Sequence, residues 1–219
     1  MPPIAQRAAP PQPVKRAMCA ACLRAQSTCI CALVAPTAHS TDVLILQHPL
    51  EVHHAKNTAR LLHLSLSGSR LVVGETFDGA QLQALVPPGH TAVLLYPSTP
   101  TDTTNHAAAA PLHATRLTPA SHVTLIVLDA TWRKSRKMLH LSPALQRLPR
   151  LVLNDLPPSA YAIRKAHAPG QLSTLEATCA ALAQLEGDAA PFAPLLAAFA
   201  TFVSLRAREC NAADLQAAN

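Results

Sequence analysis

The chain has 219 residues, of which 49% are apolar and 3% aromatic, so we expect one domain with a core of Leu, Val, Ile and Ala and at most a small appendage. Its 18 Lys and Arg against 12 Asp and Glu give a net charge of +6, which favours a partner that bears phosphates or an acidic surface. No stretch approaches the ~20 continuous apolar residues of a membrane span, and the N-terminal residues lack the hydrophobic segment of a signal peptide. We therefore expect a cytoplasmic protein that makes no membrane contact and keeps its thiols reduced.

The first 36 residues divide into two predicted segments. Residues 1–17 hold five prolines and no apolar periodicity, which predicts a disordered arm. Residues 18–36 contain Cys19, Cys22, Cys29 and Cys31 in the pattern C-x2-C-x6-C-x-C. Four thiolates in a short, otherwise unstructured segment favour a structural zinc ion and leave no open position for catalysis. Four unrelated cysteines are the alternative, which the gathering of four of the six cysteines here argues against.

Short apolar runs that predict strands begin after residue 37. They lie at 43–47, 71–73, 92–96, 123–128 and 151–153, and residues 51–64, 79–85 and 132–141 are expected to be helices between them. Strands that are apolar throughout and alternate with helices indicate a mostly parallel sheet covered on both faces. Residues 99–119, rich in Thr, Pro, Ala and His, are expected to be a surface loop or an insertion.

The last third of the chain predicts two helices. Ser173 and Glu176 form a capping-box pattern that opens an Ala/Leu-rich helix, and Gly187 is placed to close it. Pro191 then allows a second helix that runs to about Arg206.

Residues 128–138 combine a carboxylate with a cluster of cations. Asp129 follows the apolar run 122–128, and Trp132, the single tryptophan, precedes four cations in five positions. At helical spacing one face carries Arg133, Arg136, Lys137 and His140, while Met138, Leu139 and Leu141 turn inward. Ligands bind at the carboxyl edge of open parallel sheets, so this stretch predicts a site that grips a polyanion and acts on it. The alternative is an ordinary solvated helix face.

Other candidate segments flank this stretch. His48, Glu51, His53 and His54 lie close together, but their spacing does not match a zinc helix, so we expect a substrate-facing loop and helix start. Residues 96–98 end a predicted strand, and residues 161–165 place a tyrosine and two cations before the helix start at Ser173, where unpaired N–H groups favour an anion.

Taken in order, these segments resemble the DTW-domain family. The residues that carry the resemblance are the segments 48–51, 57–61, 95–98, 129–132, 161–165 and 172–177, together with the cysteine cluster, so that it covers residues 19 to about 186. Two departures are mild: Ala130 stands where a small residue, often Gly, is usual, and Ala59 stands where Gly commonly follows the Asn-Thr pair. Neither departure removes a functional group.

The resemblance implies a fold and an activity. The family is related to the SPOUT-type RNA-modifying enzymes, so it implies a parallel α/β fold with a C-terminal knot, a threading that is rare in proteins. The catalytic domain is then residues 37–210, followed by a tail at 211–219. The implied reaction moves the 3-amino-3-carboxypropyl group of S-adenosylmethionine to N3 of a tRNA uridine and releases 5′-methylthioadenosine.

The resemblance also assigns roles to residues. Asp129 is expected to be the base that deprotonates N3, or the group that orients it. The residues expected to bind S-adenosylmethionine are Tyr96, Pro97, Ser98, Leu128, Thr131, Trp132, Leu172, Ser173, Thr174 and Glu176. Those expected to contact tRNA are Arg133, Arg136, Lys137, Arg164, Lys165, His48, Asn57 and Arg60.

Two other functions compete with this interpretation. A methyltransferase would use the same donor and the same kind of fold, and no residue of the chain alone separates the two reactions. A zinc-stabilised RNA-binding module without catalysis is a different class, and it leaves Asp129 and the 96–98 loop without a purpose. The oligomeric state stays open, with a monomer favoured over an oligomer.

Overall fold

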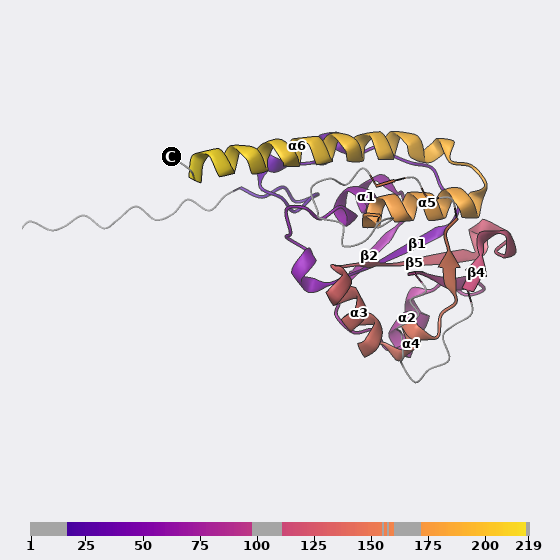
Figure 1. Cartoon of the computed structure of the whole chain (residues 1–219). Helices are drawn as coiled ribbons and strands as arrows, with labels where there is room; N and C mark the ends of the chain where they lie inside the picture. The colour runs from indigo at the N-terminus through magenta and orange to yellow at the C-terminus, as the bar shows by residue number, and fades with distance from the viewer. Residues whose placement is uncertain (1–16, 98–110, 155, 157, 160–171, 218–219) are drawn as a thin grey trace, which may run out of the picture.

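The structure is a computed structural model that describes residues 17–97, 111–154, 156, 158–159 and 172–217, of which 209–217 are described by their backbone alone. Its centre is a six-stranded sheet in the order β2-β1-β5-β3-β6-β4, in which every pair of neighbours is parallel (Figure 1). The strands are β1 (Asp42–Gln47), β2 (Arg70–Val73), β3 (Thr91–Leu95), β4 (Pro111–His113), β5 (Val123–Asp129) and β6 (Arg150–Val152). All seven residues of β5 are buried, so the strand that carries Asp129 is the core of the sheet.

Helices cover both faces of the sheet. On one face lie α1 (Ala59–Ser65), α5 (Thr174–Glu186) and α6 (Ala193–Ala217), and on the other lie α2 (Gly79–Leu85), α3 (Trp132–Leu141) and α4 (Pro143–Gln146) (Figure 1). Alternate residues of a strand point to opposite faces, so Leu125 and Val127 of β5 join the first core cluster while Ile126 and Leu128 join the second. Both faces are therefore apolar, which is why the inner positions of the central strands are mostly apolar.

Six 3-10 helices complete the described elements. They are η1 (Gln26–Thr28), η2 (Cys31–Leu33), η3 (Pro49–Glu51), η4 (Ala114–Arg116), η5 (Ala120–His122) and η6 (Ala190–Phe192). The cysteine segment contains η1 and η2, and its apolar side chains Cys22 and Ile30 belong to the core cluster under α1, α5 and α6. The segment is thus packed onto the domain.

The α/β architecture with a mostly parallel sheet is confirmed, as are the five predicted strands and the helices over 79–85, 132–141 and from Thr174. Gly187 closes α5 in the left-handed region, with φ of 72°. Leu141 is 41% exposed, so of the three apolar residues expected to turn inward from α3 only Met138 and Leu139 are buried.

Three local predictions were wrong, and one short helix was not predicted. The helix expected over 51–64 begins only at Ala59, because the Asn57 side chain accepts a hydrogen bond from the Arg60 N–H and starts the helix there. Of the expected loop or insertion 99–119, residues 99–110 lie outside the described residues, and residues 111–113 form β4 at the sheet edge. The short helix α4 was missed, and α6 continues past Arg206 to Ala217.

The last helix tests the expectation about membranes. Residues Ala190–Arg208 are long and apolar enough to cross a membrane by length and composition, which corrects the expectation that no stretch comes near that limit. The signal is weak, since a core helix passes the same test, and here 33% of the span is buried, including Phe192, Phe199 and Phe202, which are each 1% exposed.

Some predictions fall on other parts of the chain. Residues 1–16 of the predicted arm and 160–171 lie outside the described residues. The knot expected in the C-terminal part therefore stays a prediction, as do the domain boundaries.

Candidate functional site

Asp129 is the last residue of the central strand and lies at the carboxyl edge of the sheet. Its side chain is buried and accepts three hydrogen bonds. Oδ2 accepts from Nδ2 of Asn57 at 2.6 Å and from Nε2 of Gln47 at 2.9 Å, and Oδ1 accepts from Oγ1 of Thr174 at 2.9 Å. Three separate parts of the chain, the end of β1, the loop before α1 and the start of α5, therefore meet at this carboxylate.

Burial raises the pKa of the Asp129 carboxyl above its usual range, since the charged form loses its water. The three donors, Gln47, Asn57 and Thr174, lower the pKa and so oppose that effect, while the nearby charge of Glu51 adds to it. Two of these donors are amide NH2 groups, which cannot accept a proton, and both face Oδ2. A proton on this carboxyl would therefore sit on Oδ1, where the hydroxyl of Thr174 can accept.

A second charged group lies beside Asp129. Glu51 is 1% exposed and its Oε1 accepts from Nζ of Lys134 at 2.8 Å. Glu75, which follows β2, pairs with Nζ of Lys137 at 2.8 Å and with Nε2 of His48 at 3.3 Å, and both contacts lower its pKa. The carboxyl ends of β1, β2 and β5 thus bring acidic and basic side chains together, as parallel strands do.

Aromatic residues line the same edge past β3. Tyr96 is buried and makes an edge contact with Trp132, with ring centroids 6.0 Å apart. The guanidinium of Arg150 lies over the Tyr96 ring, 5.4 Å from its centroid, and donates to the Pro97 carbonyl at 3.0 Å. Trp132 is 36% exposed, so it offers part of its ring to a ligand.

Two helices begin at this edge. The capping box predicted for α5 is present: Ser173 Oγ accepts from the Glu176 N–H, and the Glu176 side chain accepts from the Ser173 N–H. Glu176 also accepts from the hydroxyl of Ser159 at 2.8 Å. Thr131 caps α3 by accepting from the Lys134 N–H, and Leu172, just before α5, is half-buried.

Of the four cations expected on α3, the two arginines form no ion pair among the described residues and the two lysines are paired with glutamates. Arg133 and Arg136 are exposed and form no ion pair within the described part of the chain. Lys137 is exposed but paired with Glu75. The fourth cation, Lys134, is turned toward the buried Glu51. The two arginines are therefore the cations of this helix most open to a polyanion.

Other residues expected to contact RNA lie deeper. His48 is 5% exposed and its Nδ1 caps η3 by accepting from the Leu50 N–H. Asn57 is buried and gives its amide to Asp129. Arg60 is half-buried on α1, where burial lowers its pKa although the nearby Cys22 thiol opposes the shift. Their contact with RNA stays a prediction, as do the roles of Ser98, Arg164 and Lys165, which lie outside the described residues.

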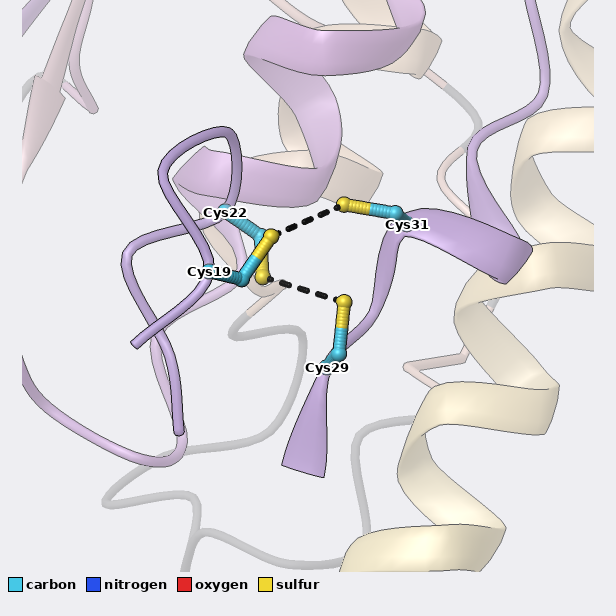
Figure 2. Close-up of side chains that lie close together, drawn as sticks. All are labelled: Cys19, Cys22, Cys29 and Cys31. Atoms are coloured by element: carbon cyan, nitrogen blue, oxygen red, sulfur yellow. Dashed lines mark hydrogen bonds between the residues drawn. The ribbon is translucent and has the colours of Figure 1, made fainter. Parts of the chain in front are cut away.

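The four cysteines form one cluster (Figure 2). All four Sγ atoms lie within 4.8 Å of one another, and the pairs Cys19–Cys31 and Cys22–Cys29 are each 3.6 Å apart. A tetrahedral zinc ion with Zn–S bonds of about 2.3 Å spaces its sulfurs by about 3.8 Å. The donor set and its spacing therefore fit a metal ion that prefers thiolates.

The thiols of the cluster influence one another. Backbone N–H groups of Cys22 and Ala21, with hydrogen bonds from neighbouring thiols, lower the pKa of Cys19 to about 6. The hydrogen bond with Cys29, together with burial, raises the pKa of Cys31 to about 12. Four thiolates this close would repel one another, and a bound metal ion would neutralise that repulsion.

A hollow of about 680 Å³ lies elsewhere, between α2, α4 and the sheet, and includes Leu82, Ala92, Ile126 and Ala144 in its lining. None of the predicted site residues lines it. We take the carboxyl edge as the candidate site because that is where the polar side chains converge.

Sequence reasoning missed Gln47 as a member of the site, and it missed the pairing of Glu51 with Lys134. Gln47 carried one usable signal, a polar residue that directly ends an apolar strand at the expected ligand edge. The pairing of Glu51 with Lys134 joins residues 83 positions apart and follows only from the fold.

Comparison with known proteins places the chain among related sequences. A model of the DTW domain matches residues 16–207. The chain is 34% identical over 80% of its length to tRNA-uridine aminocarboxypropyltransferase 2 of Drosophila melanogaster, covering 68% of that protein. It is 32% identical over 78% of its length to the protein of the same name in Mus musculus, covering 57% of it. It is also 29% identical over 61% of its length to tRNA-uridine aminocarboxypropyltransferase A of Arabidopsis thaliana, covering 54% of that protein.

These relatives are longer than the chain, which spans between about half and two thirds of their length. No solved structure matches the chain significantly. The family model nevertheless covers most of the sequence, from the cysteine cluster through most of the last helix. The chain belongs to the DTW domain family.

Proposed function

We propose that this chain is a tRNA-uridine aminocarboxypropyltransferase that uses S-adenosylmethionine as donor and forms a 3-amino-3-carboxypropyl uridine. The relatives named for this activity support the proposal, because the match extends over about four fifths of the chain in the fly and mouse proteins. The observation that carries it is the convergence on Asp129 of Asn57 and Thr174, which come from separate segments that carry the family resemblance.

The chemistry requires a base and a fixed geometry. N3 of uridine carries a proton and is a poor nucleophile until that proton is removed. The bond from N3 to the aminocarboxypropyl carbon forms as the bond from that carbon to sulfur breaks, and the electron pair stays on sulfur in 5′-methylthioadenosine. The sulfonium has three carbons open to attack, so the protein must hold the correct one in line with N3.

Asp129 is our candidate to accept the N3 proton or to orient N3. Its raised pKa supports the first role, since a carboxylate of higher pKa is a stronger base. Its three hydrogen bonds support the second, because they fix the carboxylate in one position. In either role the substrate must approach Oδ1 of Asp129, because Oδ1 accepts only the hydroxyl of Thr174 whereas Oδ2 accepts two amides.

The donor is proposed to bind along the edge formed by β3, β5 and the start of α5. Tyr96 and Trp132 supply aromatic faces for an adenine or uracil ring. The N-terminus of α5, capped by Ser173, supplies the partial positive charge suited to the donor's carboxylate. The remaining donor-binding residues of the proposal are Pro97, Ser98, Leu128, Thr131, Leu172, Thr174 and Glu176.

Binding of tRNA is proposed to involve the exposed cations of α3. Arg133 and Arg136 are available for phosphates, and Lys137 becomes available when it leaves Glu75. Contacts of this kind release counterions, so the affinity for tRNA should fall steeply with salt. Arg164, Lys165, His48, Asn57 and Arg60 complete the proposed RNA-binding set.

The cysteine cluster is proposed to hold one zinc ion through Cys19, Cys22, Cys29 and Cys31. When bound, the ion would contribute folding energy to a segment that has little regular structure of its own. Four thiolate ligands fill its coordination sphere, so the role is structural. A cytoplasmic location and a monomeric state stay predictions.

One assay tests the activity and its alternatives. The protein is incubated with unmodified tRNA and S-adenosylmethionine, the small product is identified, and the tRNA is weighed by mass spectrometry. We expect methylthioadenosine and a gain of about 101 Da on a uridine, whereas methyl transfer would give S-adenosylhomocysteine and about 14 Da. Binding of tRNA without consumption of the donor would identify a non-catalytic RNA-binding module. Either of the last two outcomes overturns the proposal.

A further inference from the structure

Arg24 links the segment of the cysteine cluster to the loop that carries Asn57. Its side chain reaches the loop before α1, where Nη1 donates to the Ala55 carbonyl at 2.7 Å and Nη2 donates to the Asn57 carbonyl at 2.9 Å. These partners are 31 and 33 positions away in the sequence, so the contact is a tertiary one. One guanidinium thus fixes two carbonyls of a loop that has little regular structure of its own.

The backbone of Arg24 is held by the turn over residues 19–24, which we call the cysteine knuckle. The Cys19 N–H donates to the Arg24 carbonyl at 2.7 Å, and the Leu23 N–H donates to the Cys19 carbonyl at 2.9 Å. Leu23 has φ of 58°, a left-handed conformation that costs energy in a residue with a branched side chain. Ligation of Cys19 and Cys22 by one metal ion would hold this turn, and with it the starting point of the Arg24 side chain.

The loop that Arg24 holds carries Asn57. The Asn57 amide donates to Asp129 at 2.6 Å, the shortest of the three hydrogen bonds to that carboxylate, and its Oδ1 accepts from the Arg60 N–H at 3.3 Å. A shift of the Asn57 main chain would therefore move both the start of α1 and one donor of Asp129. The contact from Arg24 is made to the main chain of Asn57, so it survives removal of the Asn57 side chain.

We propose that Arg24 is a positioning residue for the reaction site, through which the metal-bound cysteine knuckle sets the position of Asn57 against Asp129. The inference rests on the proposed function in that it takes Asp129 as a residue of the reaction. It assigns the cysteine cluster a role beyond stabilising its own segment, because loss of the metal would shift Asn57 at the carboxyl edge of β5.

The chain offers a matched control for Arg24. The guanidiniums of Arg24 and Arg206 both lie over the ring of Phe202, at 5.2 Å and 5.7 Å from its centroid. Both replacements, R24A and R206A, remove a cation from the same ring, and R24A also removes the two bonds to the loop. R206A therefore tests loss of the ring contact, and faster exchange of the loop in R24A than in R206A supports the two bonds as the cause.

The first test measures the loop directly. Backbone deuterium uptake of the segment 53–60 is compared in the zinc-loaded wild type, R24A and R206A, with zinc content measured for each. We expect R24A to keep its zinc and to exchange this segment about tenfold faster, and R206A to match the wild type there. Chelation of zinc from the wild type should give the same increase, with little further change in chelated R24A. Equal uptake in R24A and R206A would overturn the proposal.

The second test is a double-mutant cycle in the transfer reaction. We expect R24A and N57A each to lower kcat about tenfold, and the double variant to be no slower than the slower single variant, since both act on one hydrogen bond. R24K should recover part of the loss because an ammonium can reach one of the two carbonyls, and it replaces R24A if that variant does not fold. If the loss of kcat in the double variant equals the product of the two single losses, Arg24 does not act through the Asn57–Asp129 hydrogen bond. If the wild type shows no transfer at all, the proposed function fails, and the uptake measurement still decides the role of Arg24.

Discussion

The hydroxyl of Thr174, in the first turn of α5, donates to Oδ1 of Asp129 at 2.9 Å across 45 residues of sequence. This bond joins the start of a helix to the end of the central strand. It also makes Thr174 the donor on the Oδ1 side of the carboxylate, while the two amides occupy the Oδ2 side. Oδ1 is thus the oxygen that can exchange a proton with its surroundings.

The replacement of Asp129 by Asn tests the role of this carboxylate. An asparagine can keep all three contacts, with its oxygen facing Gln47 and Asn57 and its amide donating to the hydroxyl of Thr174. We therefore expect Asp129→Asn to fold, to bind S-adenosylmethionine nearly as the wild type does, and to lose transfer by about a hundredfold or more. Donor affinity is measured by calorimetry and transfer by release of methylthioadenosine. Near-normal turnover would rule Asp129 out as the base.

The pH dependence of transfer depends on the donors to Asp129. The Thr174 hydroxyl stabilises the ionised carboxylate, so Thr174→Val should raise the pKa of Asp129 further. The base must be ionised to act, so activity should be lost as pH falls through that pKa, and in the variant the loss should begin at higher pH. The measurement is kcat/KM against pH for both proteins. If the acid limb of the pH profile is unchanged and activity is lower at every pH, Thr174 acts through binding of S-adenosylmethionine and not through Asp129.

The exposed arginines of α3 should govern binding of tRNA. Removing a cation that meets a phosphate weakens binding and lowers the slope of log affinity against log salt by about one per contact. We expect Arg136→Ala combined with Lys137→Ala to do both, while the affinity for S-adenosylmethionine stays the same. Arg147→Ala, which removes an exposed cation after α4, is the control and should leave the slope unchanged. If only donor affinity changes in the double variant, the basic face is not an RNA surface.

Loss of a ligand cysteine should remove the metal and part of the stability. Cys22 is 2% exposed and lies in both the thiol cluster and the core. We expect Cys22→Ser to bind no zinc and to unfold at a lower temperature than the zinc-loaded wild type, because binding to the native state alone stabilises it. Zinc content and calorimetry provide the measurement.

Cys179 supplies the matched control for that experiment. It is 1% exposed on α5, outside the cluster, and burial raises the pKa of its thiol to about 12. Such a thiol is inert, so Cys179→Ala should keep one zinc ion per chain. A zinc content that fell equally in both variants would mean that the metal does not depend on the cluster alone.

The buried apolar residues of α6 should contribute more to the free energy of unfolding than the exposed ones. Phe199 is 1% exposed and belongs to the cluster under α1 and α5. We expect Phe199→Ala to lower the free energy of unfolding by about 3–5 kcal/mol, the usual cost of removing a buried phenyl ring. Leu205→Ala, which truncates a side chain that is 44% exposed on the same helix, should cost far less. Equal small losses in a denaturant titration would mean that this helix is not held by the core.

The sheet was predictable because its signal is local. Runs such as 43–47 and 123–128 are apolar at all positions but one, which indicates burial on both faces, and each became a strand. The same holds for α5, whose start depends on the side chains of Ser173 and Glu176 and whose end depends on the left-handed backbone of Gly187. The position of Asp129 at the ligand edge followed from these elements alone.

The hydrogen bonds of the site were not predictable in this way. Asn57 was expected to contact RNA, and nothing within a few residues of it indicates that its amide meets a carboxylate 72 positions later. The same residue explains why the helix expected from residue 51 begins only at Ala59, because the Asn57 side chain accepts a hydrogen bond from the Arg60 N–H at the start of α1. β4 was missed because three residues in a loop-like composition become a strand only when β6 is beside them.

The three donors to Asp129 also set when this site can exist. Gln47 precedes it by 82 residues, Asn57 by 72, and Thr174 follows it by 45, so the contact order of this one carboxylate is high. During synthesis Asp129 emerges with two of its partners already made and the third still missing. Formation of the first turn of α5 therefore completes these three bonds, and a chain interrupted before Thr174 would leave Oδ1 of Asp129 without this hydroxyl and one face of the sheet without α5 and α6.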